Sequence, residues 1–145
     1  MPGWLFATDG TIVPLILRLA LAVVIFPHGA QKALGWFGGY GFKGTMGYFT
    51  GSGIPAGLGV LAIVAELLGP LGLALGLWTR VAAFGIACVM LVAIVRVHTP
   101  HGFFMNWTGK QKGEGFEFHL LALGLALALI VGGAGAWSVD ALIAR

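Results

Sequence analysis

The sequence predicts an all-α membrane protein, a bundle of four transmembrane helices with two aromatic and glycine-rich loops capping one end. Two observations lead to this fold class. Hydrophobic residues make up 59% of the 145 residues and charged residues only 9%, a composition that excludes an ordinary soluble domain. The hydrophobic residues also fall in four long runs, each close to the roughly 20 residues that cross a bilayer. We expect one transmembrane domain over residues 1–145.

The first two runs predict the first two transmembrane helices. The first helix is expected at about 11–34, where Pro27 either kinks it or ends its regular part. The second is expected at about 54–78, and Glu66 is its only charged residue. Pro70 predicts a kink in the second helix, which membrane helices tolerate when neighbouring groups satisfy the freed carbonyl.

The other two runs predict helices at about 80–98 and 117–137. Four spans place both termini on one side of the membrane and the two longer loops, 35–53 and 99–116, on the other. Aqueous loops are usually polar, whereas these two are rich in glycine and aromatic residues. We therefore expect them to fold back onto the mouth of the bundle or to lie in the membrane interface.

The positive charges indicate a membrane orientation and exclude one class of partner. Lys43, Lys110 and Lys112 lie in the two loops, while Arg80 and Arg145 lie on the terminal side. The positive-inside rule then favours cytoplasmic loops, in a multi-pass protein of the plasma (inner) membrane. The net charge is only +3 and the basic residues are scattered. They suit lipid headgroups but form no nucleic-acid patch.

Ionisable residues inside the apolar runs predict a polar layer within the bundle. A charge in hydrocarbon costs roughly 2.5–3.5 kcal/mol on insertion scales, so such residues usually face the interior. Counted along the helices, five titratable side chains from all four spans lie at a similar depth: His28, Glu66, Arg96, Glu117 and His119. We expect Glu66 and Arg96 to form a buried ion pair, with Arg18 as the alternative partner. The pair is either a structural device that fixes helix register or part of a ligand pocket in which Glu66 or Glu117 handles protons.

The histidines could bind a ligand or simply be hydrogen-bonded. His28 and Lys32 are four residues apart and share a helix face. His98 ends the third run, and His119 lies in the first turn of the fourth. Their spacing matches no zinc motif such as HExxH, so we expect no metal site. Haem held by His28 and His119 is a less favoured alternative.

A quinone site would use these residue types. It needs donors to two carbonyl oxygens, groups that move protons, and an apolar slot for the tail. The candidates for headgroup binding are His28, Lys32, His98 and His119, with Trp36 and Trp107 placed to stack on the ring. The same residues suit other amphipathic ligands. The chain carries no recognisable electron carrier, so redox work would require a partner subunit or a bound cofactor.

Four short motifs resemble the DoxX family of small four-helix membrane proteins. They are the LR of the first run (Arg18), HGAQK (28–32), AELLG (65–69) and GLWTR (76–80). The family takes its name from a subunit of an archaeal thiosulfate:quinone oxidoreductase. The resemblance therefore implies a membrane subunit of an oxidoreductase, linked to quinone and acting with a redox partner.

That reading assigns the catalytic roles to Glu66, Arg96 and Glu117. Two other functions fit the same sequence. A non-catalytic membrane anchor or assembly factor would need packing faces but not several titratable groups. A small-molecule transporter would need a homo-oligomer, because four spans are few for one pathway.

Overall fold

The computed structural model describes residues 3–8 and 10–144, and this part of the chain is helical with no strand. Three helices are long and apolar enough to cross a membrane: Val13–Leu34, Ala56–Leu75 and Thr79–His101. The first two are α1 (Val13–Leu34) and α3 (Ala56–Leu75). The third has three parts: α4 (Thr79–Ala93), a π-helical turn, η3 (Ile94–His98), and a 3-10 turn, η4 (Thr99–His101). A shorter apolar helix, α5, spans Glu117–Gly132. The predicted all-α class is confirmed.

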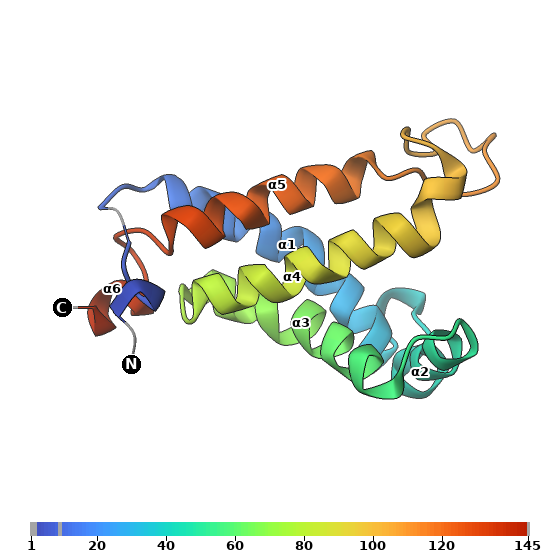
Figure 1. The fold of residues 1–145 in the computed structure, drawn as a ribbon, viewed down its shortest axis with the longest axis horizontal. Coiled ribbons are helices and arrows are strands. Elements are labelled where there is room, and N and C mark those ends of the chain that lie inside the picture. Colours follow the sequence, from blue (N-terminus) through green and yellow to red (C-terminus); the bar gives the residue numbers. More distant parts are fainter. Residues whose placement is uncertain (1–2, 9, 145) are drawn as a thin grey trace.

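These helices form one bundle (Figure 1). α1 contacts α3 and α5, and α4 contacts α3 and α5, so each helix has two neighbours. Both ends of the chain lie at one end of the bundle, with a short 3-10 turn, η1 (Gly3–Leu5), and α6 (Val139–Ile143). The two longer connections lie at the opposite end.

Glycines determine where several helices end. α3 ends at Leu75, three residues before the predicted boundary, because Gly76 adopts a left-handed φ of 65°. α5 ends at Gly132 and not at 137, since Gly133 has a φ of 78°. Pro27 does not end the first helix, which continues to Leu34.

The first long connection is more ordered than the expected loop. It contains a 3-10 turn, η2 (Trp36–Gly38), and an 11-residue helix, α2 (Gly41–Gly51). Glycines in α2 lower its intrinsic helix propensity by about 1 kcal/mol each, which hides the helix from sequence reasoning. α2 contacts both α1 and α3, and its Thr45 is buried.

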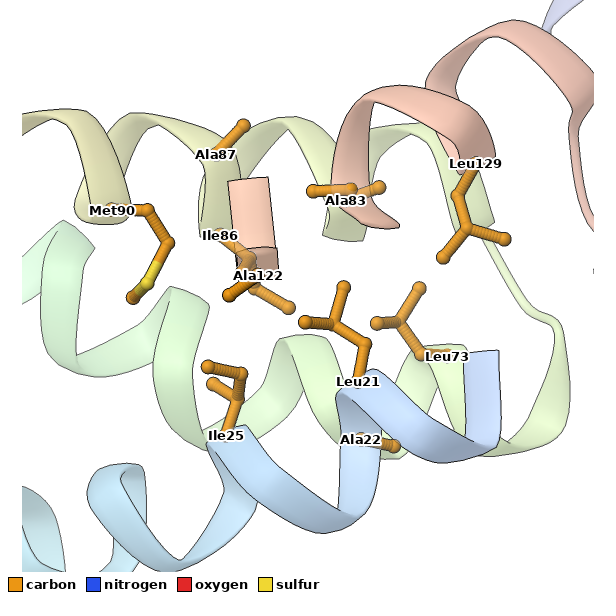
Figure 2. Packing of buried hydrophobic residues seen from close by; sticks show 11 residues of the cluster. Leu21, Ala22, Ile25, Leu73, Ala83, Ile86, Ala87, Met90, Ala122 and Leu129 are labelled. Atoms are coloured by element: carbon orange, nitrogen blue, oxygen red, sulfur yellow. The ribbon is translucent and has the colours of Figure 1, made fainter. Parts of the chain in front are cut away.

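The core lies between the four long helices (Figure 2). Leu21 and Ile25 of α1, Leu73 of α3, Ile86 of α4 and Leu129 of α5 are almost fully buried. Alanines fill the remaining positions and allow the helices to approach closely: Ala22, Ala83, Ala87, Ala122 and Ala126. The core therefore joins all four long helices, and buried polar residues lie toward both ends of the bundle.

Two arginines close the terminal end by capping helices. Arg18 is fully buried and donates to the carbonyl oxygens of Leu73 (2.7 Å) and Ala74 (3.2 Å) in the last turn of α3. It also donates to two carbonyl oxygens after α5, those of Ala134 (2.8 Å) and Trp137 (2.6 Å). Arg80 donates to the carbonyl oxygens of Ile130 and Val131 at the end of α5, at 2.8 and 3.0 Å. These bonds satisfy carbonyls that a helix end leaves without intrahelical partners.

Candidate functional site

A buried ion pair lies at the contact between α1 and α3. Lys32 Nζ is 2.7 Å from Glu66 Oε1 and 2.6 Å from Oε2. The Glu66 side chain is 3% exposed and that of Lys32 is 30% exposed. Gly29, one turn before Lys32, explains the closeness, because a Cβ at Gly29 would lie 2.1 Å from the Glu66 carbonyl oxygen. Only glycine allows the two backbones to cross here, and the crossing brings Lys32 over Glu66.

The predicted pair of Glu66 with Arg96 is therefore wrong. Arg96 is exposed and its Nη2 donates to the carbonyl oxygen of Ser52, the residue that ends α2, at 2.8 Å. Arg18, the alternative partner, donates to backbone carbonyls at the other end of the bundle. Depth along the helices was similar for Glu66 and Arg96, but the rotation of each helix points the two side chains to different neighbours.

A pocket opens beside the ion pair. Its volume is about 250 Å³, and it lies between α1 and the segment of η2 and α2 that folds back onto α1. Gln31 Nε2 donates to the Phe37 carbonyl oxygen at 3.3 Å, and a Cβ at Gly39 would lie 2.3 Å from the Gln31 carbonyl oxygen. The glycine thus permits the close return of the chain. The lining residues are His28, Gln31, Lys32, Gly38, Gly39, Tyr40 and Thr45.

His28 connects the pocket to the ion pair. It is exposed on the surface of α1, lines the pocket, and lies within electrostatic range of both Lys32 and Glu66. Its ring centroid is 5.9 Å from that of Phe118 in α5. The i, i+4 spacing of His28 and Lys32 places both on one helix face, as expected from the sequence.

The other two predicted histidines are stacked on each other. The ring centroids of His98, in η3, and His119, in α5, are 3.9 Å apart with planes inclined by 35°. His119 is 9% exposed, and its Nδ1 has no hydrogen-bond partner among the described residues. His98 is half-buried, with its Nδ1 2.8 Å from the Glu114 carbonyl oxygen. His119 also lies within electrostatic range of His28 and Lys32.

Besides Arg96, three more of the predicted site residues lie outside this cluster. Glu117 Oε1 accepts from the Met105 backbone N–H (2.8 Å) and from Trp107 Nε1 (3.0 Å), so it fastens the second loop to the start of α5. Trp36 and Trp107 are 53% and 84% exposed, and neither lines the pocket. The pocket uses Tyr40 and Thr45 instead. Sequence reasoning missed these two residues, because Tyr48, Thr50 and Ser52 of the same loop also carry hydroxyl groups and nothing in the sequence separates them.

The cluster has no metal-ligand geometry. Over residues 3–8 and 10–144, no three His, Cys, Asp or Glu side chains lie close enough together to hold a metal ion. The chemistry available is hydrogen bonding and proton transfer: an ammonium group, a carboxylate, an amide, two hydroxyls and three imidazoles. Together the fold and this cluster define a small helical membrane protein with a polar site at the loop end of its bundle.

The chain belongs to the DoxX family, whose sequence pattern matches residues 13–99. The match includes Arg18, Lys32, Glu66 and Arg80. A Bacillus subtilis (strain 168) protein named "Putative oxidoreductase CatD" is 28% identical over 115 residues, which is 79% of this chain and 76% of that protein. No solved structure matches the chain. Family membership and the apolar helices place the protein in a membrane.

Proposed function

We propose that the chain is the membrane component of an oxidoreductase system and binds a quinone headgroup in the pocket beside Lys32 and Glu66. The observation that carries the proposal is the buried Lys32–Glu66 pair at the edge of a cavity lined by His28, Tyr40 and Thr45. A structural ion pair needs no adjoining cavity with three more polar side chains. The name of the Bacillus subtilis relative supports the oxidoreductase class.

The lining suits the chemistry of a quinone ring. Its two carbonyl oxygens accept hydrogen bonds, and the Lys32 ammonium, the hydroxyls of Tyr40 and Thr45, and a His28 N–H can all donate. A volume of about 250 Å³ is below the roughly 300–1000 Å³ of drug-sized sites and suits a single-ring headgroup. A quinone takes up two electrons and two protons when it is reduced. The electrons come from a partner subunit, because the side chains of this cluster hold and move protons only.

The membrane arrangement is part of the proposal. We assign α5 as a fourth transmembrane helix, because it packs along α4 and α1 and is apolar throughout its 16 residues except for Glu117 and His119 near its start. Its two ends then lie on opposite sides of a plasma (inner) membrane. The Lys32–Glu66 pair lies toward the end of the bundle that carries the two long connections, where a headgroup can enter from the interface.

The test measures quinone that co-purifies with the protein. The chain is isolated in mild detergent, and extracted quinone is measured by mass spectrometry per mole of protein. We expect His28→Ala and Glu66→Gln to lower the occupancy about tenfold, the equivalent of about 1.4 kcal/mol of binding free energy. Lys43→Gln is the matched control, since Lys43 is exposed on α2 and does not line the pocket. Equal occupancy in all three variants would contradict the proposal.

A non-catalytic anchor is the second candidate, favoured by one observation. Large aromatic side chains are exposed at the loop end, among them Phe37 (66%), Tyr40 (88%), Phe104 (66%) and Trp107 (84%). Aromatic residues are enriched in protein interfaces. As an anchor, the chain would retain a partner protein in pull-down experiments when His28 and Glu66 are substituted, and would lose it when Phe104 and Trp107 become serine.

A further inference from the structure

The stacked histidines, His98 and His119, are not explained by the pocket. Neither residue lines it, and neither closes a helix end as the arginines do. Two imidazole rings 3.9 Å apart repel when both are charged, so their closeness is unfavourable without a counter-charge. A buried His119 Nδ1 without a hydrogen-bond partner among the described residues also costs stability, because water no longer solvates it. Side chains in such an arrangement usually have a functional reason.

Position supplies that reason, because the histidines lie in order between the loop surface and the pocket. His98 is half-buried and bonds to Glu114 in the second long loop. His119 is stacked on His98 and is buried in the first turn of α5. Beyond it, His28 and Lys32 lie within electrostatic range of His119, and Phe118 contacts the rings of both His28 and His119.

We infer that His98 and His119 form a proton relay between water at the loop end and the pocket at His28, Lys32 and Glu66. The role depends on the quinone site proposed above and adds the route by which its protons arrive. A neutral imidazole can accept a proton on its free ring nitrogen and release it again. The Nδ1 of His98 donates to a carbonyl oxygen, so its Nε2 is the nitrogen that exchanges protons. Between His119 and His28 the proton passes through water in the polar interior.

The charges around the relay come from every helix packed against it. His119 faces His98 from η3, and His28 and Lys32 from α1. His28 faces Lys32 on its own helix and Glu66 from α3. The Lys32–Glu66 pair places an ammonium group and a carboxylate side by side at the pocket end of the relay.

The first test needs no quinone. The chain has four histidines, so single substitutions assign each signal in the ¹⁵N NMR spectrum of histidine-labelled protein. We expect His98→Gln to move the pH midpoint of the His119 signals, because stacked rings titrate as a coupled pair. His101→Gln is the matched control, since the His101 ring lies against Gly113 in the loop and outside the relay. An unmoved His119 midpoint in His98→Gln overturns the relay.

The second test measures how fast protons reach the bound quinone. Protein loaded with quinone is mixed with dithionite, which gives up two electrons and, with two water molecules, becomes two bisulfite ions and two protons; the quinone takes up two electrons and two protons to become quinol. Because the released and consumed protons balance, the reaction is followed by the quinone and quinol absorbance in stopped flow. We expect His98→Ala to slow quinol formation roughly 100-fold at unchanged quinone occupancy. Added imidazole should restore the rate, which it would not do if His98 only supported the fold.

The outcomes separate the two proposals. Full occupancy with a wild-type rate in His98→Ala overturns the relay and leaves the quinone site in place. No quinone in the wild-type protein overturns the site, and with it the destination of the relay. His119→Phe is a second variant that keeps an aromatic ring in the core, and the same slow quinol formation is expected of it. If it does not fold, His98→Ala decides alone, because His98 is half-buried and its removal leaves α5 packed.

Discussion

At the scale of single residues, the two partners of the ion pair are not equivalent. Glu66 is almost completely buried, whereas Lys32 keeps 30% of its side-chain surface exposed. A lysine can extend its ammonium group along its flexible stem toward water or headgroups, but a carboxylate on the inner face of α3 cannot. The Glu66 carboxylate therefore needs its ion-pair partner to remain charged and buried, whereas the Lys32 ammonium group can be solvated without one.

This asymmetry predicts unequal effects of removing either charge. Lys32→Met leaves a buried carboxylate without its partner and should lower the free energy of unfolding by about 3 kcal/mol. Glu66→Gln should lower it by less than half as much. The double variant, Lys32→Met with Glu66→Gln, should recover most of the loss. Thermal unfolding in detergent measures all three, and a double variant whose loss equals the sum of the single losses would contradict the pairing.

Sequence reasoning reached part of this site. Hydrophobic runs and the cost of charge in lipid identified His28, Lys32, Glu66, His98 and His119, and the structure brings these five together. They did not identify the partner of Glu66. Residue counting gives depth along a helix but not its rotation, and here the rotation follows from a glycine contact between two backbones. Tyr40 and Thr45 were missed because their positions depend on how the loop folds back.

At the scale of helices, backbone contact at Gly29 determines how α1 lies on α3. A Cβ at Gly29 would lie 2.1 Å from the Glu66 carbonyl oxygen and 2.5 Å from the Leu67 nitrogen. Both atoms belong to backbone, so no side chain can rotate away to make room. A Cβ at Gly124 on α5 would have no atom within 4 Å. Both glycines lie within helices, but only Gly29 is packed against another backbone.

Alanine substitution should separate these two glycines. Gly29→Ala forces α1 and α3 apart and should lower the free energy of unfolding by about 3 kcal/mol, with loss of the Lys32–Glu66 contact and of bound quinone. Gly124→Ala adds a methyl group to an open surface and should change stability by less than about 1 kcal/mol. Thermal unfolding and quinone occupancy of the two variants give the comparison. Equal stability would mean that the helices do not cross at Gly29.

Three arginines donate hydrogen bonds to backbone carbonyl oxygens at helix ends. Arg18 binds the end of α3, Arg80 binds the end of α5, and Arg96 binds the residue that follows α2. The predicted helix boundaries at 78 and 137 were too late. The sequence shows glycines at 76 and 133, but it does not show that arginines distant in the chain bind the last carbonyl oxygens of these helices. The π-turn η3 orients Arg96 and His98, and no local sequence feature predicts this turn.

Substitution of Arg18 should therefore lower the stability of the fold far more than substitution of Arg96. Arg18→Met removes the donors to four carbonyl oxygens at a fully buried position. Hydrogen bonds to charged groups contribute about 1.5–3 kcal/mol each, so this variant should fail to accumulate as folded protein or unfold at a much lower temperature. Arg96→Met loses a single bond at an exposed position and should lose less than about 1 kcal/mol. Size-exclusion chromatography and thermal unfolding compare the two variants, and similar stability would contradict a capping role for Arg18.

At the scale of the whole molecule, the two ends of the bundle have different tasks. The terminal end is held by arginine and by Asp140, whose carboxylate accepts from the backbone N–H groups of Trp78 (2.7 Å) and Thr79 (2.9 Å) at the start of α4. Here the side-chain hydrogen bonds of Arg18, Arg80 and Asp140 join backbone groups and stabilise the fold. The loop end holds the ion pair, the pocket and the stacked histidines. Stability and chemistry are thus placed at opposite ends, with the apolar core between them (Figures 1 and 2).

The fourth transmembrane helix is the prediction that decides the membrane arrangement of the molecule. At about 1.5 Å per residue, the 16 residues of α5 span about 24 Å, short of the roughly 30 Å hydrocarbon core. Packing compensates, because α5 contacts α1 and α4, whose spans Val13–Leu34 and Thr79–His101 have 22 and 23 residues, and it runs alongside α4 (Figure 1). If α5 crosses, Thr108 in the second loop and Ala144 near the C-terminus face opposite compartments.

Cysteine labelling in intact cells tests this arrangement. Cys88, the single cysteine, is first replaced by serine; it is exposed on α4, so the fold should tolerate the change. Thr108→Cys and Ala144→Cys are then introduced separately and treated with a membrane-impermeant maleimide. The lysines of the loops favour a cytoplasmic loop end, so only Ala144→Cys should react before the cells are opened, and both should react afterwards. Labelling of both positions in intact cells would mean that α5 does not cross, and it would place the pocket end and the terminal end on the same side of the membrane.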